Sequence, residues 1–255
     1  MVLPLQDDVL YGPIPSRRLG RSLGINLLPS TYKLCSFNCL YCHYGRTAVH
    51  TLDVGPRAPD LPRAELVIER IRIALRSALD FDYLTFSGNG EPTLHPQFAE
   101  LVDRVVRLRD QYRPGVKVAL LSNSTGLFAP AVRDSLTKID LPVFKLDAGT
   151  PELFRRINRP VKGVEFSAVV DALVSLDHPY IQTLLVDGSP SNVTAGQVEA
   201  YLRHIACIQP TEVHIYSIDR PVADPRLVRV SPQRLLEIAR LGEAQTGVTF
   251  KAFWM

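Results

Sequence analysis

The sequence predicts an α/β protein built as a partial barrel of six parallel strands and their helices, a partial (β/α)6 barrel. Strand-like and helix-like segments alternate from residue 22 to residue 246. The connections between them have the length that crossovers between parallel strands require. The strands carry polar residues on one face only, whereas a doubly wound sheet buries both faces in near-continuous apolar runs. Six strands are too few to close an eight-stranded barrel, so we expect an open lateral side.

Each predicted element has its own local signal. Apolar positions with helical spacing predict helices over 62–79, 98–112 and 166–176. Thr194 with Gln197 forms a capping box at the start of another helix, and Ser231 followed by Pro232 opens the last one. The strands are expected at 24–28, 83–87, 116–123, 142–147, 180–186 and 212–218.

The polar strand face supplies candidate catalytic residues. Successive side chains of a strand point to opposite faces, so the polar residues should face the barrel interior while their apolar neighbours pack on helices. These polar residues are Lys145, Asp147, Gln182, His214 and Tyr216. We predict a catalytic role for Lys145, Asp147, His214 and Tyr216, acting on a small or medium polar substrate. The alternative for Lys145 and Asp147 is that they pair only with each other.

The composition is that of a globular protein. The chain has 255 residues, 46% of them hydrophobic and 22% charged, and a net charge of +3. We expect one domain over 1–255, made of an N-terminal extension (1–21), the partial barrel (22–220) and a C-terminal helical segment (221–255). No apolar run approaches the roughly 20 residues that span a bilayer, and the first residues do not resemble a signal peptide. These observations predict a cytoplasmic protein without a membrane partner.

Three of the four cysteines lie within eight residues, as Cys35, Cys39 and Cys42. The fourth, Cys207, falls on a helical pattern and is expected to be a buried small apolar residue. Three thiolates at this spacing can hold a four-iron cluster and leave one iron without a protein ligand. A structural zinc site usually has four ligands in two knuckles, and only His43 is a conceivable fourth ligand here. The spacing therefore favours a 4Fe-4S cluster over zinc.

With Tyr41 directly before the last cysteine, this segment resembles the defining motif of the radical S-adenosylmethionine (SAM) superfamily. The resemblance implies that SAM binds the open iron and is cleaved reductively to a 5′-deoxyadenosyl radical, which abstracts a hydrogen atom from the substrate. It also implies a reducing electron donor of flavodoxin or ferredoxin type. Tyr41 is expected near the adenine.

Two later motifs extend the resemblance. The turn of Gly88, Asn89, Gly90 and Glu91 resembles the family's Gly-Gly-Glu-Pro motif, which binds the SAM amino group, and glycine permits the close backbone approach this needs. Ser122 and Asn123 stand where the family binds ribose hydroxyls or the methionine carboxylate. The alternative for the second pair is a polar turn that caps the next helix.

Segments 11–24, 145–149, 157–160 and 218–221 look like a bacterial subgroup related to wyosine-type tRNA-modifying radical SAM proteins. A nucleic acid is therefore a possible partner, although the small positive charge adds little support. The wyosine-forming relatives need, as the resemblance implies, a second cluster from upstream cysteines. No cysteine precedes Cys35, so we do not expect a complete wyosine-forming synthase.

The sequence is compatible with three functions. The first is an enzyme that performs SAM-dependent radical chemistry. The second is an iron–sulfur redox sensor or electron-transfer protein, and the third is a zinc-stapled RNA-binding module. The glycine-rich turn and the polar barrel interior favour the enzyme, because an electron carrier needs neither.

Overall fold

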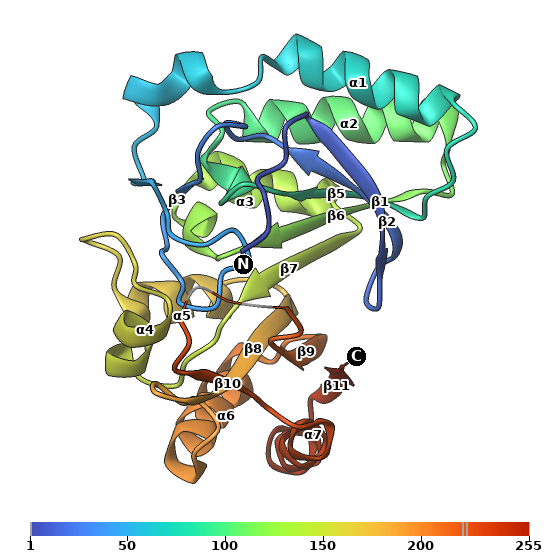
Figure 1. Cartoon of the computed structure of the whole chain (residues 1–255). Coiled ribbons are helices and arrows are strands. Elements are labelled where there is room, and N and C mark those ends of the chain that lie inside the picture. Colours follow the sequence, from blue (N-terminus) through green and yellow to red (C-terminus); the bar gives the residue numbers. More distant parts are fainter. Residues whose placement is uncertain (1, 221, 223, 255) are drawn as a thin grey trace. The chain divides into compact units, whose positions relative to one another are not determined.

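The computed structural model describes residues 2–220, 222 and 224–254, in which strands and helices alternate (Figure 1). The chain forms two compact units. The N-terminal unit comprises Pro4–Ser36 and Thr47–Pro142, and the C-terminal unit comprises Met1–Leu3, Phe37–Arg46 and Val143–Met255. Residues 37–46 contain two of the three motif cysteines, so the cysteine segment divides between the units. We refer to residues 37–46 as the cysteine loop.

The sheet of the N-terminal unit has four strands: β1 (Leu10–Ser16), β2 (Gly20–Asn26), β5 (Tyr83–Ser87) and β6 (Lys117–Ser122). β2, β5 and β6 are parallel and follow one another in chain order, while β1 pairs with β2 in the antiparallel sense. β1 thus belongs to the sheet, although the sequence suggested only an extension over 1–21. Pro13 and Pro15 interrupt its strand pattern, which is why the sequence did not reveal it.

The helices of this unit are α1 (Ala64–Arg76), α2 (Phe98–Tyr112) and α3 (Pro130–Ser135). α1 buries Val67, Ile71 and Leu75, which lie four residues apart on one helical face. α1 and α2 pack side by side (Figure 1). A short parallel pair, β3 (Leu34–Cys35) and β4 (Val49–His50), flanks the cysteine loop in the sequence. The 3-10 turns are η1 (Gly55–Asp60), η2 (Pro92–Leu94), η3 (Thr125–Phe128) and η4 (Leu136–Lys138).

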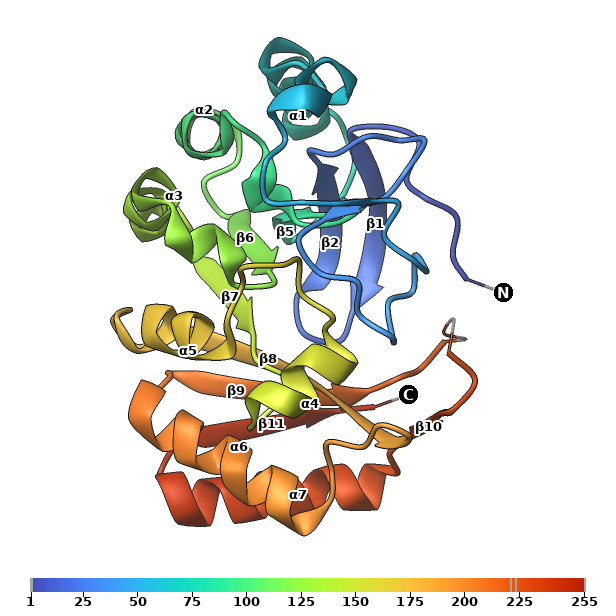
Figure 2. The same cartoon turned by 90° about the vertical axis from the view of Figure 1, so that its left-hand side faces the viewer.

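In the C-terminal unit, β7 (Leu141–Lys145), β8 (Tyr180–Gly188), β9 (Glu212–Ser217) and β11 (Thr249–Phe253) form parallel pairs in that order. β10 (Leu227–Arg229) pairs with the end of β8 in the antiparallel sense. The helices are α4 (Pro151–Ile157), α5 (Phe166–Val174), α6 (Ala195–Ile208) and α7 (Pro232–Thr246). α6 and α7 cover one face of β9 and β11 (Figure 2).

The predicted α/β class is confirmed. In each unit the parallel strands follow chain order, as successive β/α units of a barrel do, whereas a doubly wound sheet reverses its order at a central strand. The sequence predicted only a helix in the segment 221–255, whereas the structure also has the strands β10 and β11 there. Phe250 of β11 is buried, and its ring lies next to Gly242 of α7, where a larger side chain would clash with it. No helix in the described part of the chain is both long and apolar enough to span a membrane.

The strands of the C-terminal unit separate polar from apolar side chains as expected. The register aligns Lys145 with Gln182, and Gln182 with His214. The alternate residues Phe144, Ile181, Val213 and Ile215 are almost fully buried. Thr183, on the same face as these, bonds through its hydroxyl to the Tyr201 hydroxyl of α6 at 2.6 Å. The helices therefore cover the apolar face and leave the polar face of the strands on the other side.

Candidate active site

The cysteine loop is folded by backbone hydrogen bonds. The Cys42 amide donates to the Cys39 carbonyl oxygen at 3.2 Å, and the Gly45 amide donates to that of Cys42 at 2.9 Å. The Leu40 amide donates to the Ile157 carbonyl oxygen at 3.0 Å, which anchors the loop to the end of α4. Cys39 and Cys42 are partly exposed and form no disulfide. The loop therefore holds two reduced thiols in a defined turn.

Cys35, the third motif cysteine, is buried at the end of β3 in the N-terminal unit. Because the three cysteines divide between the units, neither unit contains more than two of them. Among the described residues, the structure gathers no group of three His, Cys, Asp or Glu side chains with the geometry of a metal site. The three-cysteine ligand set therefore remains a prediction.

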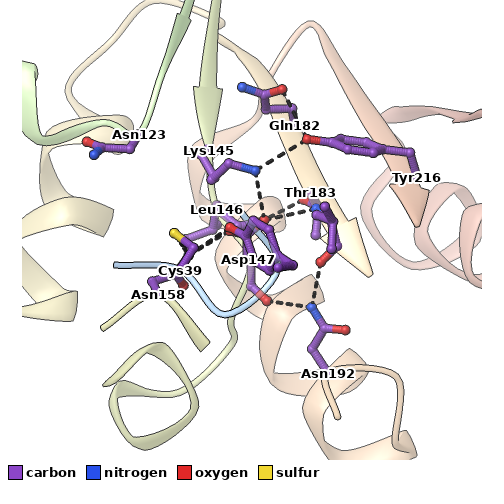
Figure 3. A network of polar contacts seen from close by, with 12 residues as sticks. Cys39, Asn123, Lys145, Leu146, Asp147, Asn158, Gln182, Thr183, Asn192 and Tyr216 are labelled. Carbon is purple, nitrogen blue, oxygen red and sulfur yellow. Dashed lines mark hydrogen bonds and ion pairs between the residues drawn. The ribbon is translucent and has the colours of Figure 1, made fainter. Parts of the chain in front are cut away.

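A buried polar network surrounds Asp147, just past the end of β7 (Figure 3). The Tyr41 hydroxyl and the Asn158 amide both donate to Asp147 Oδ2, the amide at 2.7 Å. The Leu184 backbone amide donates to Asp147 Oδ1 at 2.9 Å. Lys145 Nζ lies 3.4 Å from the same Oδ1. One fully buried carboxylate thus holds together the cysteine loop, β7, β8 and the end of α4.

Lys145 is the charged partner in this network. Its Nζ lies 3.3 Å from the Tyr216 hydroxyl, which in turn lies 3.4 Å from Gln182 Oε1. It also lies 5.1 Å from the centroid of the Tyr41 ring, a cation–π distance. Burial alone would lower the pKa of Lys145, but the charge of Asp147 and the Tyr216 contact raise it above the ordinary lysine value. The side chain is therefore an ammonium at neutral pH, suited to bind an oxygen atom and unsuited to act as a nucleophile.

His214 has a separate environment on the same sheet face. Its Nε2 lies 2.5 Å from Glu212 Oε1, and Glu212 also pairs with Lys251 at 2.5 Å. The His214 ring packs against those of Tyr180 and Phe253. The structure therefore joins Lys145, Asp147 and Tyr216 of the predicted catalytic residues in one network and gives His214 its own ion-pair cluster.

In the N-terminal unit, the turn at residues 88–91 needs its glycines for a steric reason. Gly88 and Gly90 have φ of +120° and +151°. A Cβ atom on Gly90 would lie 1.7 Å from the Leu34 carbonyl oxygen, and one on Gly88 would lie 2.6 Å from Asn26 Oδ1. The glycines thus allow this turn to pack closely against β2 and β3 within the protein, in addition to the close approach of SAM that the sequence predicted.

The two polar residues of the same turn have their side chains bound within the protein. Asn89 donates to the Gln6 and Pro29 carbonyl oxygens, at 2.8 and 2.9 Å, and accepts from the Gln6 amide. Glu91 accepts from both the backbone and the hydroxyl of Thr93, and from the Ser122 hydroxyl and the Asn123 amide. These side chains position the turn, so the predicted SAM contacts of Asn89 and Glu91 would have to come from the backbone.

Glu91 is almost fully buried. Burial raises the pKa of its carboxyl group, although the hydrogen bonds from Asn123, Thr93 and Ser122 partly oppose the shift. Its partners connect the turn at 88–91 to the end of β6, where Ser122 and Asn123 lie. The structure thus brings the two predicted SAM-binding motifs together.

Asn123 extends this connection to the first cysteine. Its amide donates to Ser36 Oγ at 2.8 Å and lies 3.5 Å from Cys35 Sγ. Its Oδ1 accepts from the Thr125 backbone amide at 3.0 Å, at the start of η3. Asn123 therefore does cap the following turn, as the alternative suggested, and at the same time it contacts a motif cysteine.

Sequence reasoning missed Asn158 as a site residue. Its amide donates to Asp147, lies 3.1 Å from the Tyr41 hydroxyl and lies 3.6 Å from Cys39 Sγ. Its Oδ1 is buried and has no hydrogen-bond donor among the described residues. The only signal in the sequence was its place in the segment 157–160, which was recognised by resemblance and given no role.

Two further outcomes concern single residues. Cys207 is exposed, so the expectation of a buried position was wrong; on α6, Ile205 and Ile208 face the core and Cys207 faces away. Pro221, which closes the segment 218–221, lies outside the described residues. The rest of that segment includes Asp219, whose carboxylate lies 3.8 Å from His43.

The donor set fits an iron–sulfur cluster. Two of the three motif thiols, Cys35 and Cys39, each lie within hydrogen-bond distance of an asparagine amide nitrogen. Thiolates are the ligands of such clusters, and hydrogen bonds to their sulfur atoms tune the reduction potential. The unpartnered Asn158 Oδ1 offers an acceptor to a further group beside Cys39. These side chains are therefore compatible with a cluster and a polar cofactor.

Fold and site together define a parallel α/β enzyme whose polar residues gather at the carboxyl ends of the strands. The chain belongs to the Radical SAM superfamily, whose profile matches residues 30–190. That range contains Cys35, Cys39 and Cys42, the turn at 88–91, and Asp147 with its partners Lys145 and Asn158. The predicted superfamily is thus confirmed, whereas the wyosine-type subgroup remains a prediction.

The chain is similar to a UPF0026 protein of Helicobacter pylori (strain J99), with 31% identity over 219 residues. The alignment covers 84% of this chain and 67% of that relative, so the chain spans about two thirds of its length.

Two solved structures illustrate the shared fold. One is TYW1 with a lysine-pyruvate adduct bound, with a TM-score of 0.63, 19% identity, and coverage of 89% of this chain and 75% of the other. The other is Streptococcus suis SuiB bound to S-adenosylmethionine, with a TM-score of 0.65, 12% identity, and coverage of 91% and 50%. At these identities the likeness concerns the fold alone.

Proposed function

We propose that this protein is a SAM-dependent radical enzyme that acts on a small or medium polar substrate. Cys35, Cys39 and Cys42 hold a 4Fe-4S cluster, and SAM binds along Gly88–Glu91, Ser122, Asn123 and Tyr41. The observation that carries the proposal is the Lys145–Asp147–Tyr216 network, which lies in the same unit as Cys39 and Cys42 and shares Asn158 with Cys39. The enzyme works in the cytoplasm and takes electrons from a flavodoxin or ferredoxin.

A cluster and SAM, when bound, supply a one-electron reductant and a carbon-centred acceptor for a hydrogen atom. The chain's own residues do the rest. The Asn123 and Asn158 amides donate to the cysteine sulfur atoms and stabilise negative charge on them. The buried turn at 88–91 keeps its backbone groups in place because Asn89 and Glu91 are satisfied within the protein.

Lys145 orients the substrate. Its side chain is 14% exposed, and its Nζ contacts Asp147 and the Tyr216 hydroxyl. A buried ammonium binds a carboxylate, phosphate or carbonyl oxygen strongly, because little water competes for it. We therefore place a substrate oxygen atom beside Lys145 Nζ, within reach of Tyr216 and Gln182.

The lysine-pyruvate adduct in the TYW1 structure raises the question of whether Lys145 forms one too. Adduct formation needs a neutral amine, and the Asp147 ion pair keeps Lys145 protonated. We therefore assign Lys145 a binding role and no covalent one.

The test of this function is anaerobic reconstitution followed by addition of SAM and a chemical reductant. Wild-type protein should hold about four irons and four sulfides per chain and should release 5′-deoxyadenosine. Cys35→Ala, Cys39→Ala and Cys42→Ala should each lose the cluster. Cys207→Ala is the matched control, since Cys207 is exposed on α6 and should be dispensable.

Two results would refute the proposal. Stoichiometric zinc without iron in anaerobic protein would favour the zinc-stapled RNA-binding module. A stable cluster that yields no 5′-deoxyadenosine with SAM would favour a redox sensor or electron carrier.

The substrate site has its own test. A small-molecule fraction of a cell extract should stimulate 5′-deoxyadenosine formation by the wild-type protein. Lys145→Met should keep the cluster and the basal SAM cleavage and lose this stimulation. Lys251→Met, which removes a lysine from β11 on the same sheet face, is the matched control and should respond as the wild type does. An unchanged response of Lys145→Met would remove Lys145 from the site.

A further inference from the structure

A pocket of about 230 Å³ opens beside Cys39 in the C-terminal unit. The cysteine loop forms one wall, with Asn38, Cys39, Leu40, Gly45 and Arg46. The other wall is formed by Arg159 and by residues 224–226. Three arginines therefore surround a space that reaches a motif cysteine. We refer to Arg46, Arg159 and Arg226, together with Asp224, as the arginine pocket.

The arginine pocket is positively charged. Arg226 pairs with Asp224 at 2.7 Å, and this contact lowers the pKa of Asp224 to about 2. Arg46 and Arg159 are exposed, and the charge of Arg159 also contributes to the lowered pKa of Asp224. Three guanidinium groups against one carboxylate leave two positive charges at neutral pH.

The position of Arg159 is set by the cysteine loop. Its φ is +47°, in the left-handed region that residues other than glycine seldom adopt. The Asn38 amide donates to the carbonyl oxygens of both Asn158 and Arg159, at 3.0 Å each. The next residue, Pro160, forms a β-bridge with Phe37. A strained conformation that is held by its surroundings is typical of functional positions.

The same segment contacts the motif cysteine from the other side. Asn158, which precedes Arg159, has its amide nitrogen 3.6 Å from Cys39 Sγ. Arg159 of the arginine pocket is thus adjacent in sequence to Asn158, whose side chain contacts the predicted cluster ligand Cys39. Any partner that binds the arginines comes close to the cluster.

We propose that the arginine pocket is the docking surface for the acidic one-electron carrier protein that reduces the cluster. The proposal rests on the function proposed above. Exposed arginines on a rim attract an acidic partner over long range and orient it on approach. The transfer moves one electron from the reduced carrier to the cluster, so the carrier is oxidised by one electron and no bond is made or broken.

The exposure of the arginines favours a protein partner over a small anion. The Arg226 side chain is 61% exposed, so water competes for a single small anion there. An acidic protein surface presents several carboxylates at once and excludes water over a wider area. The experiment must therefore distinguish the binding of an acidic protein from the binding of free phosphate.

The experiment measures the rate of cluster reduction by two reductants. One is reduced flavodoxin, an acidic protein, and the other is photoreduced 5-deazariboflavin, a small uncharged molecule. The variants are Arg46→Glu and Arg159→Asn, singly and together; asparagine tolerates the left-handed backbone of residue 159. Arg240→Glu, at an exposed position on α7, is the matched control.

We expect the double variant to slow reduction by flavodoxin at low ionic strength about tenfold or more. Its reduction by 5-deazariboflavin should match that of the wild type, and Arg240→Glu should change neither rate. Added salt should slow flavodoxin reduction of the wild type and should have a smaller effect on the double variant.

An unchanged flavodoxin rate in the double variant overturns the proposal. Equal slowing with both reductants also overturns it, because the arginines would then act on the cluster itself. Binding of inorganic phosphate that is lost in the variants, with an unchanged flavodoxin rate, would show a small-anion site in its place. Failure of the proposed function looks different: wild-type protein reduced by 5-deazariboflavin would then form no 5′-deoxyadenosine.

Discussion

Each unit of the protein contains one buried carboxylate at its site, and the two are stabilised in opposite ways. Among the described residues, the donors to Glu91 in the N-terminal unit are all neutral and belong to Thr93, Ser122 and Asn123. Asp147 in the C-terminal unit accepts from neutral donors too, but it also pairs with the Lys145 ammonium. Glu91 thus fixes the position of neighbouring backbone groups, whereas Asp147 stabilises the positive charge of Lys145.

The difference indicates what each region does. The turn at 88–91 has its polar side chains satisfied by the protein, so it offers a ligand a rigid backbone surface. In the network around Asp147, the Lys145 side chain is 14% exposed, and Asn158 Oδ1 has no hydrogen-bond donor among the described residues. This difference fits the proposed roles, in which the turn binds SAM through its backbone and Lys145 binds a substrate oxygen atom.

Asp147→Ala should have the largest effect on stability. It leaves the Lys145 charge buried without its partner, which costs about 3–5 kcal/mol. Glu91→Ala should cost less, about 1–3 kcal/mol, because it leaves only neutral donors unpaired. Chemical denaturation of both variants measures the two costs. Equal losses of unfolding free energy in the two variants would show that the Asp147–Lys145 ion pair stabilises the protein no more than the neutral hydrogen bonds of Glu91 do.

Gly90→Ala should follow, with a loss of about 2–4 kcal/mol from a strained positive φ and a clash with the Leu34 carbonyl oxygen. The matched control is Gly115→Ala in the same unit, where a Cβ atom meets nothing within 4 Å. It should be neutral or slightly stabilising. SAM binding, measured by calorimetry, should weaken only in Gly90→Ala. Normal stability and SAM affinity in that variant would mean that the turn is adaptable and the comparison is wrong.

Glu91→Gln should change the pH dependence of stability, because it removes a buried group that titrates. Burial raises the pKa of Glu91 above its ordinary value of 4.5, so the folded protein binds this proton more tightly than the unfolded chain does. The resulting stabilisation is complete below pH 4.5 and is lost as the pH rises through the raised pKa. The unfolding free energy of the wild type should therefore fall relative to that of the variant as the pH rises from 4.5 through the raised pKa. A difference that grows with pH would show that the hydrogen bonds outweigh burial.

Asn158→Ala should have the smallest effect, on the reduction potential of the reconstituted cluster. Loss of an amide donor worth about 1 kcal/mol to Cys39 Sγ lowers a one-electron potential by about 40 mV. Asn192→Ala is the control, since Asn192 donates to the Asp147 carbonyl oxygen at 2.9 Å and no cysteine contact of its side chain is found among the described residues. Spectroelectrochemical titration should show a lower potential in the first variant only. A shift of equal size in both would mean that the network acts as a whole.

The sequence was most informative where one local rule determined the outcome. Strand alternation placed Lys145, Asp147 and Tyr216 together, because side chains on one strand face must meet neighbours from adjacent strands. Cysteine spacing and the glycine-rich turn identified the superfamily. Both patterns are short in sequence and nearly independent of tertiary context.

The remaining features depend on contacts between distant segments. Asn158 reaches Cys39 across 119 positions of the chain, and Asn89 bonds to Gln6 across 83. No periodicity encodes such pairs. The pairing of His214 with Glu212 could have been suspected, since the two lie two residues apart on one strand face, but a histidine on a polar face drew attention first as a catalytic candidate.

β1, which the sequence did not predict as a strand, has a consequence for self-association. It is the outer strand of its sheet, and Pro13 and Pro15 each lack the backbone amide donor that other residues would supply there. An exposed strand with a full row of donors invites a second chain to extend the sheet, and prolines at an edge are a common protection against this. The prolines of β1 therefore protect this edge of the sheet against pairing with a strand of a second chain.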